Sequence, residues 1–215
     1  MKNQPKPYSE SCVQNRDPIF NVIEPLFRNK KNILEIGSGT GQHAVYFAQK
    51  MPHLSWQTSD QLAYHDGIKQ WLTEAALDNT PPPIKLNVSK DTWPELEIDA
   101  IFSANAVHIM SWQNVVDFIK NACKLLDTGG LLVLYGPFNY DNTYTSESNA
   151  RFDIWLKQRD PESAIRDFEA VNELAEESGM HLIKDVAMPA NNRILCWQKN
   201  SARTSHQFDE SSLVL

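Results

Sequence analysis

Short apolar runs alternate with longer amphipathic stretches along most of this 215-residue chain. The run 131–135 is fully apolar, as in a strand buried on both faces. Between 115 and 126, apolar residues recur at helical spacing until Gly129-Gly130 stops the pattern. The alternation predicts a parallel sheet with crossover helices. Expected helices are 17–27, 42–51, 62–77, 115–126 and 165–177, and expected strands are 32–36, 54–58, 84–88, 98–103, 131–135, 181–186 and 193–197.

The last two expected strands are separated only by AMPANN, residues 187–192. That segment is too short for a crossover helix, so the pair is predicted to be an antiparallel hairpin. The fold class is therefore α/β, a doubly wound, mostly parallel sheet with a C-terminal antiparallel hairpin. This order of elements resembles the class I S-adenosylmethionine-dependent methyltransferases, and the resemblance implies their Rossmann-like fold.

Composition excludes several classes of partner. The formal charge is -7, and Lys30-Lys31 is the only visible basic cluster, so we expect no nucleic-acid partner. No run approaches the ~20 apolar residues of a membrane helix, and the N-terminal segment MKNQPKPYSESC lacks the apolar core of a signal peptide. The three cysteines are scattered and have no metal-site spacing, so we expect reduced thiols, no metal and a cytoplasmic location.

The stretch ILEIGSGTGQHAVYFAQ carries three alternate glycines, Gly37, Gly39 and Gly41, between an expected strand and an expected helix. A phosphate-binding P-loop would end in Gly-Lys-Ser/Thr, and this loop continues with Gln42-His43 instead. A dinucleotide site would place the third glycine one position later. The G-x-G-x-G spacing, with Glu35 before it, resembles motif I of methyltransferases; a dinucleotide site and a structural glycine turn are the alternatives.

The resemblance implies that the cofactor is S-adenosylmethionine. Glu35 would accept from its ammonium group, directly or through water, and the glycines would let the backbone approach its methionyl and ribose parts. Asp60, about 20 residues past the glycines, would meet the ribose hydroxyls; its alternative role is a helix N-cap. The candidate cofactor-binding residues are Glu35, Gly37, Ser38, Gly39, Thr40, Gly41, His43, Asp60, Asn87, Val88, Asn105 and Ala106.

Asn87 stands where the family often has an Asp that accepts from the adenine amine, and the next amide, of Val88, would meet a ring nitrogen. Asn105 and Ala106 would lie along the methionyl chain. The sequence here reads Asn-Ala-Val-His, which argues against the enzymes that methylate adenine or glutamine amino groups, since those carry Asn/Asp-Pro-Pro-Tyr/Phe. His108 is the candidate general base, or else it caps the next helix.

After residue 136 the periodicity breaks. The segments NYDNTYTSESN, RFDIWLKQRDP, IRDFE and MPANN, together with QNRDPIF and WQTSD, resemble the methyltransferase-like protein 26 family, and the resemblance covers roughly residues 8–198. It implies that the polar stretch, the hairpin turn and the start of the first helix bind the methyl acceptor. The candidate substrate-binding residues are Asn15, Arg16, Tyr140, Ser146, Asn149, Arg166, Asn191 and Asn192.

Each of these residues also has a structural role as the alternative to substrate binding. Arg166 either clamps an acidic group or pairs with Asp167 at the start of a helix. Asn191 and Asn192 suit a left-handed turn. The polar stretch around Tyr140 is either a lid over the substrate or a solvated loop. Arg16 either folds over the cofactor or pairs with a surface carboxylate.

We expect a single methyltransferase domain at 1–200, with a substrate-side insertion or lid at 137–160 and a disordered tail at 201–215. The predicted function is S-adenosylmethionine-dependent methyl transfer to a small-molecule acceptor. The alternatives are a protein methyltransferase, a non-catalytic module that binds S-adenosylmethionine or S-adenosylhomocysteine, and a dinucleotide oxidoreductase.

Overall fold

The computed structural model describes residues 5–201. The tail predicted to be disordered lies, apart from Ser201, outside the described residues. The helices are α1 (Glu10–Phe27), α2 (Gln42–Lys50), η1 (Leu62–Tyr64), α3 (His65–Ala75), α4 (Trp112–Leu125), α5 (Glu147–Arg159), α6 (Phe168–Glu177) and η2 (Pro189–Asn191), of which η1 and η2 are 3-10 turns. The strands are β1 (Asn32–Ile36), β2 (Ser55–Asp60), β3 (Ile84–Lys85), β4 (Ala100–Ala104), β5 (Leu131–Gly136), β6 (Phe138–Asn139), β7 (Arg166–Asp167), β8 (Met180–Met188) and β9 (Asn192–Lys199).

The main sheet has seven strands in the order β3-β2-β1-β4-β5-β9-β8. The pairs from β3 to β5 are parallel, whereas β9 pairs antiparallel with both β5 and β8. The α/β fold class and the terminal antiparallel hairpin are therefore confirmed. The strand order changes direction at β1 and β4, the point where ligands bind in open α/β sheets.

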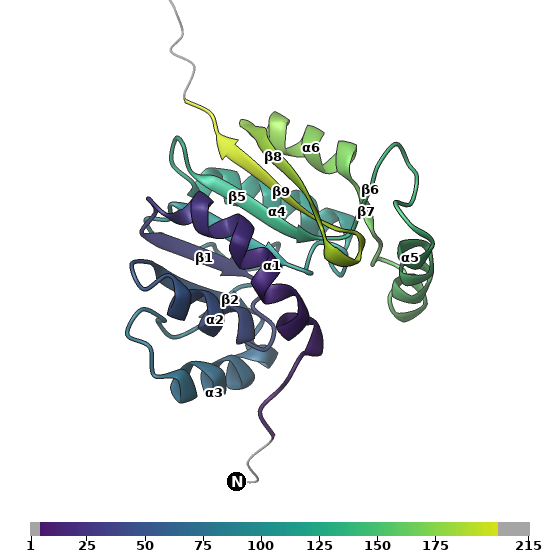
Figure 1. Cartoon of the computed structure of the whole chain (residues 1–215). Helices are drawn as coiled ribbons and strands as arrows, with labels where there is room; N and C mark the ends of the chain where they lie inside the picture. Colours follow the sequence, from purple (N-terminus) through teal and green to yellow (C-terminus); the bar gives the residue numbers. More distant parts are fainter. Residues whose placement is uncertain (1–4, 202–215) are drawn as a thin grey trace, which may run out of the picture.

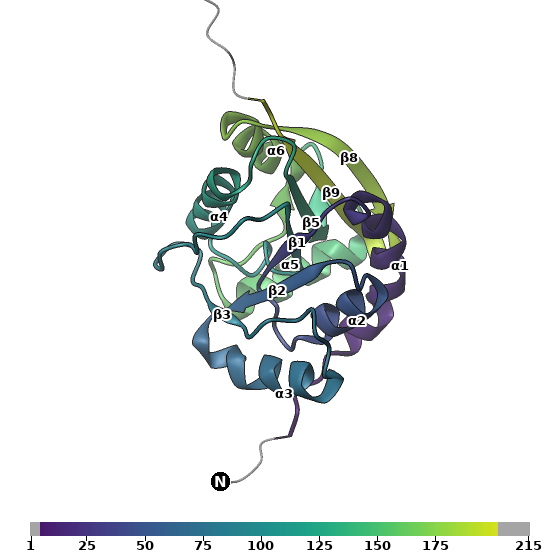
Figure 2. The ribbon, with the colours of Figure 1, turned by 90° about the vertical axis from the view of Figure 1, so that its left-hand side faces the viewer.

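Helices cover both faces of the sheet. In Figures 1 and 2, α1, α2 and α3 lie on one side and α4 and α6 on the other. On the first side, Ile33, Phe102 and Val133 pack with helix residues such as Ile23 and Phe47. On the other side, the buried residues include Leu34, Ile101, Leu134, Phe118 and Val171. The central strands are apolar on both faces because both faces are covered.

Helix α5 packs on neither face. It lies beyond the carboxyl ends of the central strands (Figure 1). In the sequence it comes between β6 and β7, and these two strands pair parallel in a separate small sheet. The sequence pattern predicted no helix there. Its buried face consists of Asn149, Asp153 and Leu156. Because two of these three residues are polar, the helix has little apolar periodicity in the sequence. The expected helix at 165–177 begins only at Phe168, since Arg166 and Asp167 form β7.

Several other expected boundaries differ. The strand expected at 84–88 contains only Ile84–Lys85, the helix expected at 115–126 begins at Trp112, and the strand expected at 181–186 runs from Met180 to Met188. Helix α1 begins at Glu10 rather than at residue 17, and it contains Pro18 and Pro25. The helix expected at 62–77 is divided into η1 and α3, and it ends where Ala76 adopts a left-handed conformation with φ of 48°.

Candidate functional site at the carboxyl edge of the sheet

The glycine loop follows β1 and leads into α2. Gly37, Gly39 and Gly41 have φ of +72°, +57° and +89°, a left-handed conformation that side chains rarely adopt. The amides of Gly37 and Ser38 both donate to the Ser59 carbonyl, at 3.0 and 3.1 Å. The loop is thus tied to the end of β2 at the carboxyl edge of the sheet.

The three glycines face different surroundings. A Cβ at Gly37 would lie 3.1 Å from the Ala106 Cβ, and one at Gly41 would lie 3.2 Å from the Ile68 Cα. A Cβ at Gly39 would meet nothing within 4 Å. Two glycines therefore permit close packing within the protein, whereas Gly39 presents bare backbone to open space, as a loop that holds a ligand does.

Asp60, the last residue of β2, lies next to this open space. One carboxylate oxygen accepts from the Gly39 amide at 2.8 Å, and the other accepts from the Gln61 amide at 2.7 Å. The residue is 9% exposed, and burial raises the pKa of its carboxyl above its ordinary value while the two amides lower it. The carboxylate binds the glycine loop, and the N-cap positions of η1 and α3 belong to Gln61 and Tyr64.

Glu35 lies beneath the loop and is 1% exposed. Its Oε2 accepts from the Trp56 indole at 3.1 Å. Burial raises the pKa of this carboxyl to about 7, and Trp56 and Ser38 oppose the shift through hydrogen bonds. Glu35 therefore carries a proton close to neutral pH and would take its negative charge when a cation approaches.

His43, in the first turn of α2, joins this helix to α1. Its Nε2 lies 2.7 Å from the Asn15 side-chain oxygen, and its ring stacks on Phe47. Burial lowers the pKa of the imidazole to about 4. Arg16, the neighbour of Asn15 on α1, lies over the Tyr46 ring with its guanidinium carbon 4.6 Å from the centroid. The start of α1 is thereby held beside the glycine loop.

The loop after β4 brings Asn105, Ala106 and His108 to the same edge. Asn105 has φ of 56°, and its amide donates to the Tyr135 carbonyl at 2.8 Å. A Cβ at Gly136 would lie 3.5 Å from His108 Nδ1 and 3.8 Å from Asn105 Oδ1, so these two side chains meet over the end of β5.

His108 is buried, and the ring of Phe152 packs edge-on against its imidazole with centroids 5.3 Å apart. Burial lowers the pKa of His108 to about 4, so the ring is neutral at pH 7. Ser111, not His108, caps α4: its hydroxyl accepts from the Asn114 amide at 3.2 Å.

Asn87 lies in a turn after β3. Its side-chain oxygen accepts from the amides of Ser89 and Lys90, both at 3.2 Å, and its own amide donates to Asp91 at 2.7 Å. Val88 is buried beside it. The oxygen that would accept from an adenine amine is thus already shared with two backbone donors.

Several candidate substrate residues hold α5 in place. Ser146 caps α5 by accepting from the Asn149 amide at 3.1 Å. The Asn149 side chain donates to the Asn191 carbonyl at 3.1 Å, and the Asn191 side chain donates to Ser148 at 3.2 Å. These contacts join the helix to the β8–β9 turn, where Asn191 has φ of 57°, the left-handed conformation expected for Asn in a turn.

Tyr140 and Arg193 both bind Asp185. The Tyr140 hydroxyl donates to Asp185 Oδ2 at 2.8 Å, and Arg193 Nη2 lies 2.6 Å from Oδ1. Burial and this carboxylate raise the pKa of Tyr140 above its ordinary value. Asn192, at the start of β9, donates to the Pro189 carbonyl at 3.2 Å. Burial raises the pKa of the Tyr135 hydroxyl above its ordinary value, and the nearby side chains of Asn15 and Asn192 oppose that shift.

Arg166 forms no ion pair with a carboxylate within residues 5–201. Its Nη2 donates to the carbonyls of Met110 and Glu162, the second at 2.7 Å, and its guanidinium carbon lies 5.9 Å from the centre of the Trp112 ring. The structural pair expected with Asp167 is not formed, since neighbouring residues of a strand point to opposite sides. Arg166 instead lines a cavity of about 440 Å³.

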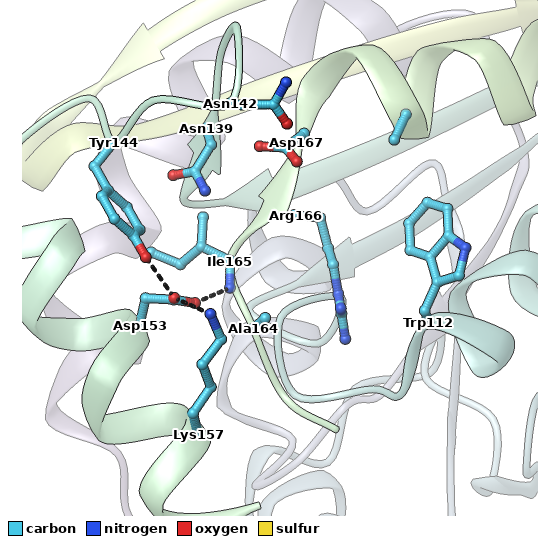
Figure 3. A pocket seen from close by; sticks show the side chains of 11 residues that line it. Trp112, Asn139, Asn142, Tyr144, Asp153, Lys157, Ala164, Ile165, Arg166 and Asp167 are labelled. Carbon is cyan, nitrogen blue, oxygen red and sulfur yellow. Dashed lines mark hydrogen bonds and ion pairs between the residues drawn. The ribbon is translucent and has the colours of Figure 1, made fainter. Parts of the chain in front are cut away.

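Sequence reasoning missed the residue that organises this region. Asp153, 1% exposed on α5, accepts from the Tyr144 hydroxyl at 2.7 Å, Lys157 Nζ at 2.6 Å and the Ile165 amide at 2.7 Å (Figure 3). An acidic residue inside RFDIW, on the apolar side of a weak helical pattern, was the available signal. Within residues 5–201, no group of three or more His, Cys, Asp or Glu side chains is arranged to hold a metal ion, and none of the helices is long and apolar enough to cross a bilayer.

The family model for proteins of unknown function called DUF938 matches residues 6–199. The chain belongs to this family. Among solved structures, the fold is similar to an O-methyltransferase family protein from Burkholderia thailandensis, with a TM-score of 0.76 and 14% identity over 90% of this chain and 58% of that one. Human N-acetylserotonin methyltransferase in complex with SAM gives a TM-score of 0.77 and 13% identity over 89% of this chain and 53% of that one.

An O-methyltransferase family 2 protein from Planctomyces limnophilus in complex with apigenin gives a TM-score of 0.71 and 15% identity over 79% of this chain and 51% of that one. The chain therefore spans between half and three-fifths of the length of these proteins. At such identities the similarity shows the fold, which is the Rossmann-like fold of S-adenosylmethionine-dependent methyltransferases.

Proposed function

We propose that this protein binds S-adenosylmethionine at the carboxyl edge of its sheet and transfers the methyl group to a small molecule. The observation that carries the proposal is the pairing of the Asp60 carboxylate with the Gly39 amide beside open space. A carboxylate there suits ribose hydroxyls, and bare glycine backbone suits a bulky ligand without phosphate. The similar fold of a methyltransferase in complex with SAM supports this choice of ligand.

The residues around the loop fit the other parts of the cofactor. Glu35, with a pKa of about 7, would meet the positively charged methionyl ammonium, directly or through water. The remaining loop residues and Asn105-Ala106 would line the methionyl chain. Near the adenine we assign the Val88 amide, which donates no backbone hydrogen bond within residues 5–201, in preference to the Asn87 oxygen, which already accepts two. When bound, the cofactor supplies an electrophilic methyl group on a sulfonium.

His108 is our candidate for the proton acceptor. Its imidazole is neutral at pH 7 and is not used to cap α4, so one ring nitrogen is available to accept a proton. Its pKa of about 4 makes it a weak base, so it would accept the proton that the acceptor atom releases once the bond from that atom to the methyl carbon is forming. Phe152 packs against this ring in a T-shaped contact.

We assign the acceptor-facing wall to Asn15, Tyr135 and Asn192, whose side chains converge beside the glycine loop. Arg16, next to Asn15 in the sequence, would support the position of α1 through its contact with the Tyr46 ring of α2. Tyr140, Ser146, Asn149 and Asn191 would act indirectly, by holding the 137–160 insertion against the hairpin. The apigenin complex of a similarly folded protein supports a small-molecule acceptor.

We further propose kinship with the methyltransferase-like protein 26 family, on the motifs WQTSD, RFDIW and MPANN. Residues 1–200 would form one domain. All three cysteines are free thiols in the structure, which suits a reducing compartment and supports a cytoplasmic location.

The test is methyl transfer from labelled S-adenosylmethionine to a small-metabolite extract and, separately, to a protein extract. We expect label in the metabolite fraction. His108→Asn should lower the rate about 100-fold without changing cofactor affinity, and the exposed His181→Asn is the matched control. Label only in protein would favour a protein methyltransferase. Cofactor binding with label in neither fraction would favour a non-catalytic module.

A further inference from the structure

A cavity lined by polar side chains lies among α5, β6, β7, α6 and the first turn of α4. Its volume of about 440 Å³ is in the range of sites for small metabolites. Its lining includes Trp112, Asn139, Asp153, Lys157, Arg166 and Asp167. Figure 3 shows that Arg166 extends from β7 toward one end of the cavity, whereas Asp167 points with Asn142 toward the other.

At the first end, Asp153 and Lys157 form an ion pair, whereas Arg166 has no carboxylate partner within residues 5–201. Asp153 is satisfied by Lys157, Tyr144 and the Ile165 amide, so the Asp153–Lys157 pair is neutral as a unit. Arg166 has only carbonyl partners, Met110 and Glu162, for Nη2, and its Nε is buried without a hydrogen-bond partner. A guanidinium has five donors in a planar fork that matches an oxyacid. This end therefore favours an anionic oxygen group.

The second end has acceptor oxygens without hydrogen-bond partners. Asn139 Oδ1 is buried without a hydrogen-bond partner, and an unsatisfied buried acceptor is costly. Asp167, which also lines the cavity, adds a carboxylate that accepts no hydrogen bond from another group within residues 5–201. A hydroxyl or amino group would satisfy these acceptors.

From this arrangement we propose that the cavity binds a small molecule that carries an acid group, carboxylate or phosphate, at one end and a hydroxyl or amino group at the other. Arg166 receives the acid group, and Asn139 with Asp167 receives the donor. Trp112 lines the cavity on the other side of Arg166, with its ring centre 5.9 Å from the guanidinium carbon. This site is distinct from the glycine loop and does not depend on methyl transfer.

The test is calorimetric titration of the full chain without S-adenosylmethionine, so that it is independent of the proposed function. The probes are butyrate, γ-hydroxybutyrate, γ-aminobutyrate, butylamine and inorganic phosphate. We expect the two bifunctional acids to bind about tenfold or more tightly than butyrate or butylamine. Comparison with phosphate distinguishes a carboxylate site from a phosphate site.

Variants separate the two ends. Arg166→Gln should weaken every acid about tenfold or more, and Arg166→Lys should restore part of the affinity. Ala164→Asp, which adds a carboxylate next to the same end without removing a contact, should have the same effect if Arg166→Gln fails to fold. Asn139→Ala should abolish the preference for the bifunctional acids. Arg28→Gln, at the exposed C-cap of α1, should change nothing. Absence of saturable binding, or equal binding by all variants, would overturn the proposal.

Discussion

The Asn15 side-chain oxygen lies 2.7 Å from Nε2 of the buried His43, and this contact fixes α1 against the helix that follows the glycine loop. Because a carbonyl oxygen only accepts, Nε2 carries the hydrogen in this arrangement. On its other side, His43 Nδ1 faces Cys12 Sγ at 3.9 Å. A neutral imidazole on α2 therefore joins α1 to the helix that follows the glycine loop.

Protonation of His43 should destabilise the fold in acid. Its pKa is about 4 in the folded protein and has an ordinary value of 6.5, so the unfolded chain binds the proton first as the pH falls. Stability from this group is complete above pH 6.5 and is lost toward pH 4. Relative to His43→Gln, the wild type should lose about 3 kcal/mol across that window, measured by urea unfolding. A constant difference between the two proteins would contradict the assigned pKa.

Ionisation of Glu35 should destabilise the fold as the pH rises, whereas protonation of His43 destabilises it as the pH falls. The folded pKa of Glu35, about 7, exceeds the ordinary 4.5, so the unfolded chain releases the proton first as the pH rises. Glu35→Gln keeps an acceptor for Trp56 but cannot ionise. The variant should gain about 3 kcal/mol over the wild type between pH 4.5 and 7 and keep that gain above pH 7. The exposed Glu95→Gln serves as control, and a gain that does not vary with pH would refute the shift.

Gly39→Ala should weaken S-adenosylmethionine binding with little loss of stability. The added Cβ meets no protein atom within 4 Å, so it projects into the space assigned to the cofactor. Backbone strain at φ of +57° costs about 1 kcal/mol. Gly129→Ala, at φ of +80° and remote from the loop, carries similar strain and should leave affinity unchanged. Equal affinities for both variants in a titration would exclude the loop as the contact surface.

Asp153→Ala should destabilise α5, because Asp153 is buried although the helix lies at the outside of the molecule. The change leaves the buried Ile165 amide without an acceptor and frees Lys157 and Tyr144. We expect a loss of about 2–3 kcal/mol in the free energy of unfolding, and faster proteolysis within 137–165. Glu147→Ala on the same helix removes only an exposed pair with Arg151 at 3.7 Å and should have little effect. A silent Asp153→Ala would mean that α5 is held by other contacts.

The sheet could be predicted because its central strands are buried on both faces and the helices that cover it are amphipathic. The strand at 32–36 and the terminal hairpin are where the apolar pattern indicated. Helix α5 could not be predicted, since its buried side includes Asn149 and Asp153, whose burial depends on partners far along the chain. The same holds for Arg166: it reads as the start of a helix, but pairing of β7 with β6 makes it a strand residue.

The glycine loop and Asp60 were predictable because local backbone geometry and strand ends determine them. The cavity lined by Arg166 could not be predicted, because its lining comes from five separate elements, α4, β6, α5, β7 and α6, and from loops that only the folded chain brings together.

The most direct test of the central claim is calorimetric titration of the protein with S-adenosylmethionine, S-adenosylhomocysteine and NADH, repeated for Asp60→Ala. Asp66→Ala, an exposed change in the first turn of α3, is the matched control, and circular dichroism checks that each variant folds. We predict micromolar binding of the first two ligands, no binding of NADH, and loss of affinity in Asp60→Ala alone. A folded protein, free of copurified ligand, that binds neither S-adenosyl compound would contradict the account.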